Sequence, residues 1–482
     1  MQFQYILEKS DGPGIMEFNK NLKNTISLFS FELLSRLLGF LAVTYLARIL
    51  GKSSFGVINI GLAVLSYTMI FGSGGLNLLG TRKIISKNED STITSDIISA
   101  RIFLSVIIYI ITAVPVYFLI HSREIAAVIL AYNLFLFPSA FLLEWFFQGY
   151  QRMDIISFGR IAGMTAYLLL ILIIVKNPGD TVMTGIAWTG GGIINAVLLI
   201  YYFKKFNYKL KINLRNLKSF YLIKESFFLG TAAAITSFVQ MFPIIYLGII
   251  AGTNEAGIYS AASKTVILML VFDRVFSALF FPKIIKYFNE SPDTLNNILN
   301  RSLKIISFFS LSFSVLTVIV SGFMINFIFG SGFAGAVLPF RILTAFFAMT
   351  LVNSIFTYTL IGINREKIYT ASIFLGMIIF LISTFLLTDF LGTPGPAAAM
   401  ILFELSSMLF MYYKISKIFS FKLYSKFLFP SAAAVIISLL LLALKTSLLI
   451  QIILTLIVAV PVIALLTGFT FEEIRFIKRI FT

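Results

Sequence analysis

Cysteine is absent from this chain of 482 residues, and histidine occurs only once, at position 121. A chain without cysteine forms no disulfides and binds no metal through thiolates. We expect His121 to be an ordinary residue of an external turn. We expect no metal site and no bound cofactor.

Charged residues are scarce as well. They make up 12% of the chain, whereas hydrophobic residues make up 59% and the mean hydropathy is +0.95. A soluble domain averages nearer one half apolar and one quarter charged residues. Apolar runs of about 20 residues recur from end to end, and each is long enough to span a bilayer as a helix. The composition predicts an all-α polytopic membrane protein, without a hydrophilic stretch long enough to fold as a soluble domain.

The apolar runs predict about fourteen transmembrane helices. Their expected ranges are 25–47, 55–79, 96–120, 125–150, 155–175, 182–203, 221–250, 255–281, 301–329, 334–361, 369–390, 394–413, 428–445 and 448–467.

The net charge of +17 does not indicate a nucleic-acid partner, because the basic residues lie mostly in short loops between apolar runs. Cytoplasmic loops of membrane proteins carry such an excess of lysine and arginine. Loops near 82–87, 204–218, 283–286, 365–367 and 414–426 are basic. The loops expected outside hold only Arg48, Lys52, Arg123, Lys176 and Lys445. This asymmetry predicts that both termini are cytoplasmic and that the number of spans is even.

The first residues, MQFQYILEKSDGPGI, have neither the basic start nor the apolar core of a signal peptide. We expect residues 1–24 to form a cytoplasmic tail, and translation from Met16 is an equally sensible start.

Two parts of the chain recur at a fixed offset. Tyr45, Leu46, Gly51 and Gly56 return 201 positions later, from Tyr246 to Gly257. Gly149, Arg152, Ile155, Gly163 and Met164 return 213 positions later, from Gly362 to Met377. The copies are separated by an even number of spans, so the sequence predicts two parallel six-helix halves. The expected parts are the halves 25–203 and 221–416, a basic cytoplasmic linker 204–220, two additional helices in 428–467 and a cytoplasmic tail 468–482.

The first predicted helix carries Glu32 and Arg36 near its middle, where a charge costs about 2.5–3.5 kcal/mol on insertion scales. Glu32, Ser35, Arg36 and Gly39 share an arc of about 100°. Leucines cover the other side, so the polar arc is expected to face protein or a cavity. One interpretation is that the two charges, four residues apart, only neutralise each other and join helices.

Further charges at membrane depth favour a functional interpretation. They are Glu144, Lys264, Arg274, Arg341 and Glu404. Because cations outnumber acids, the sequence favours an anionic ligand bound by Arg36, Lys264, Arg341 and Arg274. Glu32, Glu144 and Glu404 would support these cations or couple transport to a cation. Asp273 and Arg274 also suit an interfacial pair, and Arg160 lies close enough to the cytoplasm to reach the membrane surface.

The segment Gly51-Lys52-Ser53 matches the end of a phosphate-binding P-loop. That motif needs a glycine five positions before Gly51, where this chain has Leu46. We therefore expect no ATP binding, and no catalytic constellation indicates an enzyme.

The N-terminal region resembles the polysaccharide transporter family of the multidrug/oligosaccharidyl-lipid/polysaccharide superfamily. The resemblance rests on residues 27–87, which include SFELLSRLLGFLAVTYLARILGKSSFGVINIGLAV and GSGGLNLLGTRKIIS. It implies a fourteen-helix flippase of the bacterial inner membrane. Such a protein moves undecaprenyl-diphosphate-linked O-antigen or capsule repeat units from the cytoplasmic to the external leaflet. Besides this glycan and the bilayer, its partners would include a polysaccharide polymerase and a chain-length regulator.

Lipid II flippases share the segment Ser35 to Phe40 and the following Ala47-Arg48. They have a further arginine where this chain has Leu41-Ala42, and an arginine pair where it is apolar around Met69. These departures favour a polysaccharide precursor. A cation-coupled drug exporter of the same superfamily, a major facilitator and a scaffold for glycan polymerases are the other interpretations. The facilitator's basic loop motif is missing from LLGTRKIISKNED.

The membrane potential can drive the implied transport without ATP. It is worth about 2.3 kcal/mol per charge per 100 mV, so two negative charges moving outward gain about 4–5 kcal/mol. Exchange against H⁺ or Na⁺ at Glu32, Glu144 or Glu404 is a further possibility.

Overall fold

A computed structural model describes residues 15–86, 90–208, 210, 212, 221–223, 226, 231–273, 284–288, 290–444, 446–473 and 475. The side chains of residues 15–30, 32, 90, 91 and 292 lie outside this description. All regular secondary structure in the described residues is helical. The chain divides into two compact units, Met1–Gly257 and Ile258–Thr482.

The first unit contains nine helices within the described residues and the start of a tenth. These are α2 (Ile15–Ser73), α3 (Leu76–Ile85), α4 (Asp90–Leu119), α5 (Arg123–Asn133), α6 (Leu136–Ala140), α7 (Glu144–Gly149), α8 (Met153–Ile174), α9 (Thr181–Lys205), α11 (Thr231–Ile250) and the beginning of α12 (Thr253–Met269).

The second unit contains the remainder of α12 and ten further elements within the described residues. These are α14 (Pro292–Phe329), the 3₁₀ helix η1 (Ser331–Ala336), α15 (Val337–Gly362), α16 (Glu366–Leu391), α17 (Pro394–Ile415), the π-helix η2 (Tyr424–Leu428), α18 (Phe429–Ala443), α19 (Leu448–Leu454), the π-helix η3 (Thr455–Ala459) and α20 (Val460–Thr467).

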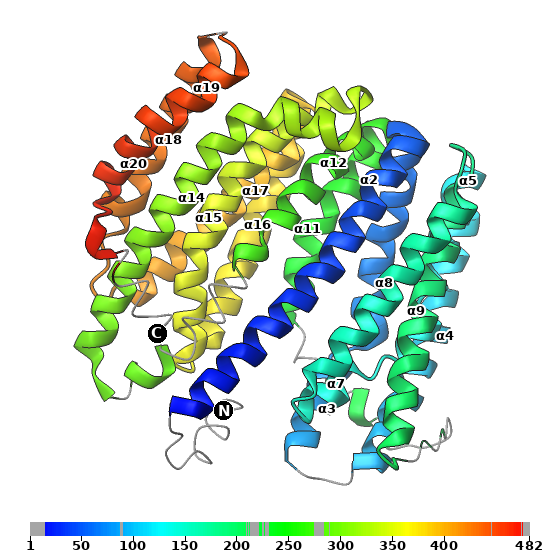
Figure 1. The fold of residues 1–482 in the computed structure, drawn as a ribbon. Coiled ribbons are helices and arrows are strands. Elements are labelled where there is room, and N and C mark those ends of the chain that lie inside the picture. The colour runs from blue at the N-terminus through cyan, green and yellow to red at the C-terminus, as the bar shows by residue number, and fades with distance from the viewer. Residues whose placement is uncertain are drawn as a thin grey trace. The chain divides into compact units, whose positions relative to one another are not determined.

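Thirteen helical stretches of the described residues are long and apolar enough to cross a membrane. One of them, Leu33–Ser73, is 41 residues long and is broken at Gly51, whose φ of 71° and ψ of 175° are not helical. The two arms of α2 meet at this break and fold back on each other (Figure 1). Counted separately, they bring the total to fourteen. The predicted all-α polytopic class is therefore confirmed.

The predicted helix 125–150 is not continuous. The structure divides it into α5, α6 and α7, with Pro138 inside α6. Proline lacks the backbone N–H that a continuous helix needs, and its ring displaces the preceding turn. The buried side chain of Arg101, on α4, contacts the main chain after this proline, at the end of α6 and before α7. Its guanidinium donates to the carbonyl oxygens of Ser139 at 2.5 Å and Leu142 at 3.1 Å.

The second arm of α2 and the start of α12 cross at two glycines. A Cβ atom placed on Gly56 would lie 1.8 Å from the carbonyl oxygen of Thr253, and one on Gly257 would lie 2.0 Å from that of Lys52. The hydroxyls of Ser53 and Thr253 are 2.9 Å apart at the same crossing. Gly56 and Gly257 are two of the residues that the 201-position offset relates, so the repeated positions contact each other reciprocally.

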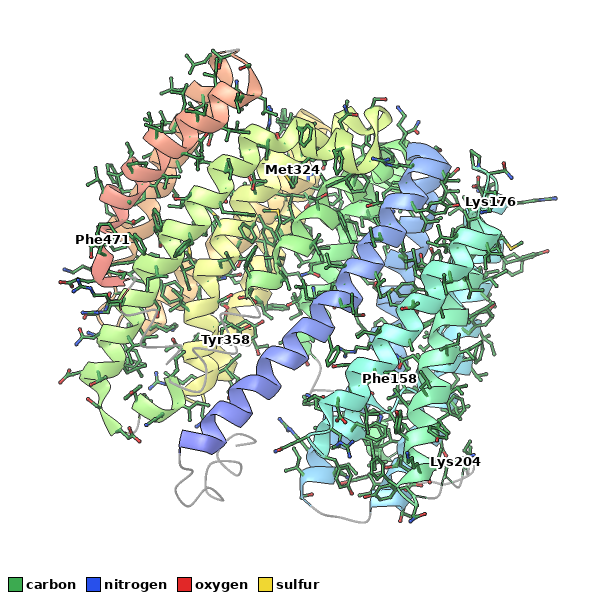
Figure 2. The ribbon with its side chains drawn as sticks, viewed as in Figure 1. Phe158, Lys176, Lys204, Met324, Tyr358 and Phe471 are labelled. Atoms are coloured by element: carbon green, nitrogen blue, oxygen red, sulfur yellow. The ribbon has the colours of Figure 1, made fainter. Side chains whose placement is uncertain are left out.

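Helices α8 and α9 run side by side in the first unit (Figure 1). A Cβ atom on Gly163 would lie 2.8 Å from the carbonyl oxygen of Gly191, and one on Gly191 would lie 2.6 Å from that of Gly163. Small residues allow such close approach between membrane helices, where packing replaces the hydrophobic driving force. Lys176 and Lys204 lie near opposite ends of α9 (Figure 2).

Candidate functional site

Arg36 lies on the first arm of α2 and is half-buried. Its neighbour Ser35 is buried, whereas Leu34, Leu37 and Leu41 are 45%, 42% and 56% exposed. The leucines thus form an outward face, as predicted, and the serine faces the interior of the unit. The side chain of Glu32 lies outside the described residues, so the predicted Glu32–Arg36 pair is not described.

Lys264 lies on α12, within the second unit, and is half-buried. Among the described residues it has neither a hydrogen bond nor an ion pair. A half-buried ammonium at membrane depth, without a carboxylate partner among the described residues, is costly and is suited to bind an anion. Arg274, the next predicted cation, lies outside the described residues.

Asp273, at the end of this span, accepts hydrogen bonds from two hydroxyls of α15. The donors are Ser354 and, at 3.3 Å, Tyr358. Tyr358 is marked on α15 in Figure 2.

An apolar groove of about 460 Å³ lies in the second unit between α14, α15 and α18. Val318 of α14, Ala348 and Met349 of α15, and Val435 and Leu439 of α18 contribute to its wall.

Arg341 of α15 is the one charged side chain among the described residues that line this groove. Its Nε donates to the hydroxyl of Ser321 at 2.8 Å, which fixes the direction of the guanidinium. Its other N–H groups make no hydrogen bond with a described residue. An arginine has five N–H donors, so the groove combines a long apolar wall with free donors for an anion.

Glu404 of α17 is buried in the second unit, with 5% of its surface exposed. The amide of Asn353, on α15, donates to its Oε1 at 2.9 Å. No cationic side chain of the described residues pairs with it. A buried carboxyl group with only neutral donors is favoured in its protonated form or with a bound cation. This environment is consistent with the predicted coupling role.

Glu144 begins α7 and is paired with Arg160 of α8. The guanidinium donates through Nη2 to Oε2 at 2.5 Å and through Nε to Oε1 at 3.0 Å, a bidentate arrangement. The amide of Asn195, on α9, approaches Oε1 at 3.5 Å. From the sequence, Arg160 is expected at the membrane surface, so this pair was not predicted. The sequence did contain a signal for the pair. Glu144 and Arg160 have opposite charges and lie close to the turn that joins the predicted spans 125–150 and 155–175.

A pocket of about 220 Å³ lies in the first unit. Its lining includes Glu144, Arg160 and Asn195, together with Ser35, Tyr167 and Trp188. The structure therefore separates the predicted residues into distinct surroundings. Arg341 lies in an apolar groove, Glu404 lies in a buried polar contact, and Glu144 lies in a polar pocket. Among the described residues, no group of three or more His, Cys, Asp or Glu side chains could hold a metal ion.

A family model described as "Polysaccharide biosynthesis protein" matches residues 21–288, more than half of the chain. The chain belongs to this polysaccharide biosynthesis family. The resemblance inferred from residues 27–87 is thus confirmed.

Two relatives of this family member are provisionally named O-antigen transporters. The protein of Shigella dysenteriae is 26% identical over 81% of this chain and 98% of its own length. The protein of Escherichia coli (strain K12) is 22% identical over 82% of this chain and 97% of its own length.

Two solved structures share the fold of this family member. A lipid II flippase MurJ in an inward closed conformation has a TM-score of 0.69 at 15% identity, over 91% of this chain and 98% of its own. A multidrug resistance MATE family transporter in an inward-facing conformation has a TM-score of 0.64 at 14% identity, over 80% of this chain and 94% of its own. The latter belongs to the MOP superfamily, which is the multidrug/oligosaccharidyl-lipid/polysaccharide superfamily named above. The chain has the fold of these multi-pass membrane transporters.

Proposed function

We propose that this protein is a flippase for polyprenyl-diphosphate-linked glycans. It moves undecaprenyl-diphosphate-linked repeat units of O-antigen or capsule from the cytoplasmic to the external leaflet. The observation that carries the proposal is the apolar groove with Arg341 as its charged lining residue. A polyprenyl diphosphate combines a long apolar chain with an anionic head, and the groove matches both parts. Family membership and the names of the two bacterial relatives support the same substrate class.

The two parts of the groove contribute differently to binding. The bilayer is as apolar as the groove wall, so burial of the polyprenyl chain there gains little free energy and mainly positions the lipid. Affinity and orientation would come from the diphosphate, because a guanidinium donates two parallel hydrogen bonds to phosphate oxygens. In the predicted topology Arg341 lies nearer the external end of its span. It would therefore hold the head group at the external leaflet.

The remaining predicted cations would act along the path of the diphosphate. We assign Arg36, Lys264 and Arg274 to this role, with Glu32 holding Arg36 charged and oriented. The expected organisation is two parallel six-helix halves, 25–203 and 221–416, with 204–220 as linker and 428–467 as additional helices. Transporters built from such halves bind substrate near the midplane and move one half against the other.

Energy would come from the membrane potential, which favours outward movement of a dianion by about 4–5 kcal/mol at 100 mV. Coupling to H⁺ or Na⁺ would use Glu404, whose carboxylate lacks a cationic partner among the described residues. The protein would lie in the bacterial inner membrane with both termini cytoplasmic. It would operate beside a polysaccharide polymerase and a chain-length regulator.

A cation-coupled drug exporter is the second candidate, favoured by the fold of the MATE transporter and by the buried Glu404. A lipid II flippase is a third, favoured by the fold alone. Deletion of the gene in its own cells separates the three. If the protein is a glycan flippase, the deletion leaves lipid-linked repeat units on the inner leaflet and removes surface glycan. Drug resistance and lipid II transport should then be unchanged. Loss of drug resistance with intact surface glycan would contradict the proposal.

A further inference from the structure

The polar pocket of the first unit has no place in the proposed path of the diphosphate or of the lipid chain. It lies among α2, α6, α7, α8 and α9, with a volume of about 220 Å³. By the liquid volume of water this is room for about seven water molecules. Such a volume suits one small polar ring, and it is too small for an oligosaccharide or a polyprenyl chain.

The charged side chains that line this pocket among the described residues are of opposite sign. Glu144 and Arg160 are the two charged side chains among the described residues that line it, and they form a bidentate pair at 2.5 and 3.0 Å. An anion entering the pocket would meet the carboxylate, and a cation would meet the guanidinium. The pair therefore disfavours both a phosphate and a coupling cation. It leaves a surface on which an uncharged ligand can both donate and accept hydrogen bonds.

Polar groups of neutral type surround the pair. Ser35 contributes a hydroxyl, and Asn195 contributes an amide that both donates and accepts. The indole N–H of Trp188 is buried and has no hydrogen-bond partner among the described residues. A buried donor left without an acceptor costs about 1–3 kcal/mol, so an acceptor supplied by a ligand would recover this loss.

Aromatic rings, glycines and the apolar side chains of Leu142 and Met164 complete the wall. Trp188 packs edge to face on Tyr167, with ring centroids 5.0 Å apart, and lies 5.9 Å from the ring of Phe135. Gly163 and Gly191 also line the pocket, where the lack of side chains lets the backbones of α8 and α9 approach closely. A sugar ring presents hydroxyl groups at its edge and an apolar face of C–H groups. A wall of mixed hydrogen-bonding groups and aromatic rings is complementary to both.

We propose that this pocket binds one uncharged sugar of the lipid-linked glycan and thereby selects which repeat unit is transported. The inference rests on the proposed flippase function and adds a carbohydrate subsite to it. Glu144 and Arg160 contact hydroxyl groups as a neutral pair, Asn195 reads a neighbouring hydroxyl, and the Trp188 N–H donates to a ring or hydroxyl oxygen. The diphosphate is held elsewhere, by the cations assigned to its path above.

The tryptophan content of the chain provides the test. There are two tryptophans, Trp145 and Trp188, and Trp145 does not line the pocket. In the Trp145→Phe protein, purified in lipid nanodiscs, all tryptophan emission comes from Trp188. The probes are a panel of free neutral monosaccharides and the free repeat-unit oligosaccharide released by acid from the cell's own lipid-linked intermediate. Inorganic pyrophosphate is the anionic comparison.

We expect a saturable change in Trp188 emission with the oligosaccharide and with one class of monosaccharide, and none with pyrophosphate. Asn195→Leu should weaken sugar binding at least tenfold, and the paired change Glu144→Gln with Arg160→Gln should do the same without leaving a lone charge. The matched control is Arg152→Gln with Asp154→Asn. It removes a bidentate pair of the same kind, at 3.0 and 2.8 Å, outside the pocket, and should leave binding unchanged. Elution volume and thermal unfolding check that each variant is folded.

The subsite is wrong if no sugar changes the Trp188 emission, or if Asn195→Leu and the paired variant bind sugar like the parent protein while folded. Competition by pyrophosphate would also overturn it, because it would make the pocket an anion site. These outcomes are distinguishable from a failure of the proposed function. If cells still require the protein to export glycan while the purified protein binds no free sugar, the flippase assignment stands and only the subsite is lost.

Discussion

Gly56 and Gly257 lie against each other's helix backbone, each within van der Waals contact of the carbonyl four residues before the other. The Cβ position of Gly56 falls 1.8 Å from the oxygen of Thr253, and that of Gly257 falls 2.0 Å from the oxygen of Lys52. The contact is reciprocal, and it joins two positions that the sequence repeat relates. Neither helix can accept a side chain here without moving away from the other.

This crossing predicts a steep cost for the smallest substitution. Gly56→Ala and Gly257→Ala should each lower the free energy of unfolding by about 1–3 kcal/mol, because overpacking against backbone cannot be relieved by a rotamer change. The matched control is Gly322→Ala in α14, where a Cβ atom would meet nothing within 4 Å. Alanine favours a helix over glycine by about 1 kcal/mol, so this variant should be at least as stable as the parent. Thermal unfolding in one detergent measures all three, and equal melting temperatures would contradict the prediction.

Arg36 and Lys264 are expected to bind the diphosphate through different chemistry. A guanidinium binds phosphate with two parallel hydrogen bonds, whereas an ammonium acts as a point charge. Arg36→Lys should therefore export glycan poorly and Arg36→Ala hardly at all, whereas Lys264→Arg should be tolerated and Lys264→Ala should not. Surface glycan is measured at matched protein levels, and Lys204→Ala, at the exposed end of α9, is the control. Normal export by both alanine variants would leave these charges a purely structural role.

Glu404 is expected to couple transport to a cation. Glu404→Gln keeps an oxygen that accepts from Asn353 but cannot bind or release a proton. Glycan-lipid transport into vesicles should respond to an imposed pH or Na⁺ gradient in the parent and should no longer respond in this variant. Ser407→Ala, on the same helix and buried, is the control for packing. An unchanged gradient response in Glu404→Gln would remove the residue from the coupling mechanism.

Glu473 gives the fold a defined acid sensitivity outside the membrane-spanning segments. Its burial raises the pKa, but the Thr470 hydroxyl at 2.5 Å, the Thr470 N–H at 2.9 Å and Lys304 at 3.3 Å together lower it below the usual value. A lowered pKa in the folded state stabilises the fold above the ordinary glutamate pKa of about 4.3. That stabilisation is lost as the pH falls through the lowered value. The melting temperature should fall on acidification below about pH 5, and by less in Glu473→Gln. Equal acid sensitivity of the two proteins would contradict this assignment.

The predicted orientation can be tested because the chain has no cysteine. Single cysteines can be placed at Asn177, which precedes the start of α9 at Thr181, and at Lys204, in its last turn. An impermeant thiol reagent added to intact cells should label position 177 and not 204, and permeabilised cells should show both. The reverse pattern would place the termini outside.

The sequence predicted the helices well because each span needs about 20 apolar residues, a requirement that is local and visible. The leucine face of the first helix followed from periodicity in the same way. Other features depended on residues far apart in the chain. The irregular segment after Pro138 depends on contacts from neighbouring helices, and Arg101 of α4 donates to two of its carbonyl oxygens. The Glu144–Arg160 pair depends on how α7 is turned toward α8. Helical periodicity predicts neither the contacts of Arg101 nor the Glu144–Arg160 pair. Arg101 was therefore missed, and Arg160 was assigned to the membrane surface.

Arg101 also shows that cationic side chains at membrane depth can have different roles, because some can stabilise the fold and others can bind a ligand. Its guanidinium donates to two main-chain carbonyl oxygens after Pro138, so it anchors the irregular segment between α6 and α7 to α4. A cell-based screen that scores only surface glycan would record Arg101→Ala as a transport-dead variant, although the lesion would be in assembly of the helix. Measuring the amount of folded protein beside every transport phenotype therefore separates the arginines proposed to bind the lipid head group from an arginine that stabilises the fold.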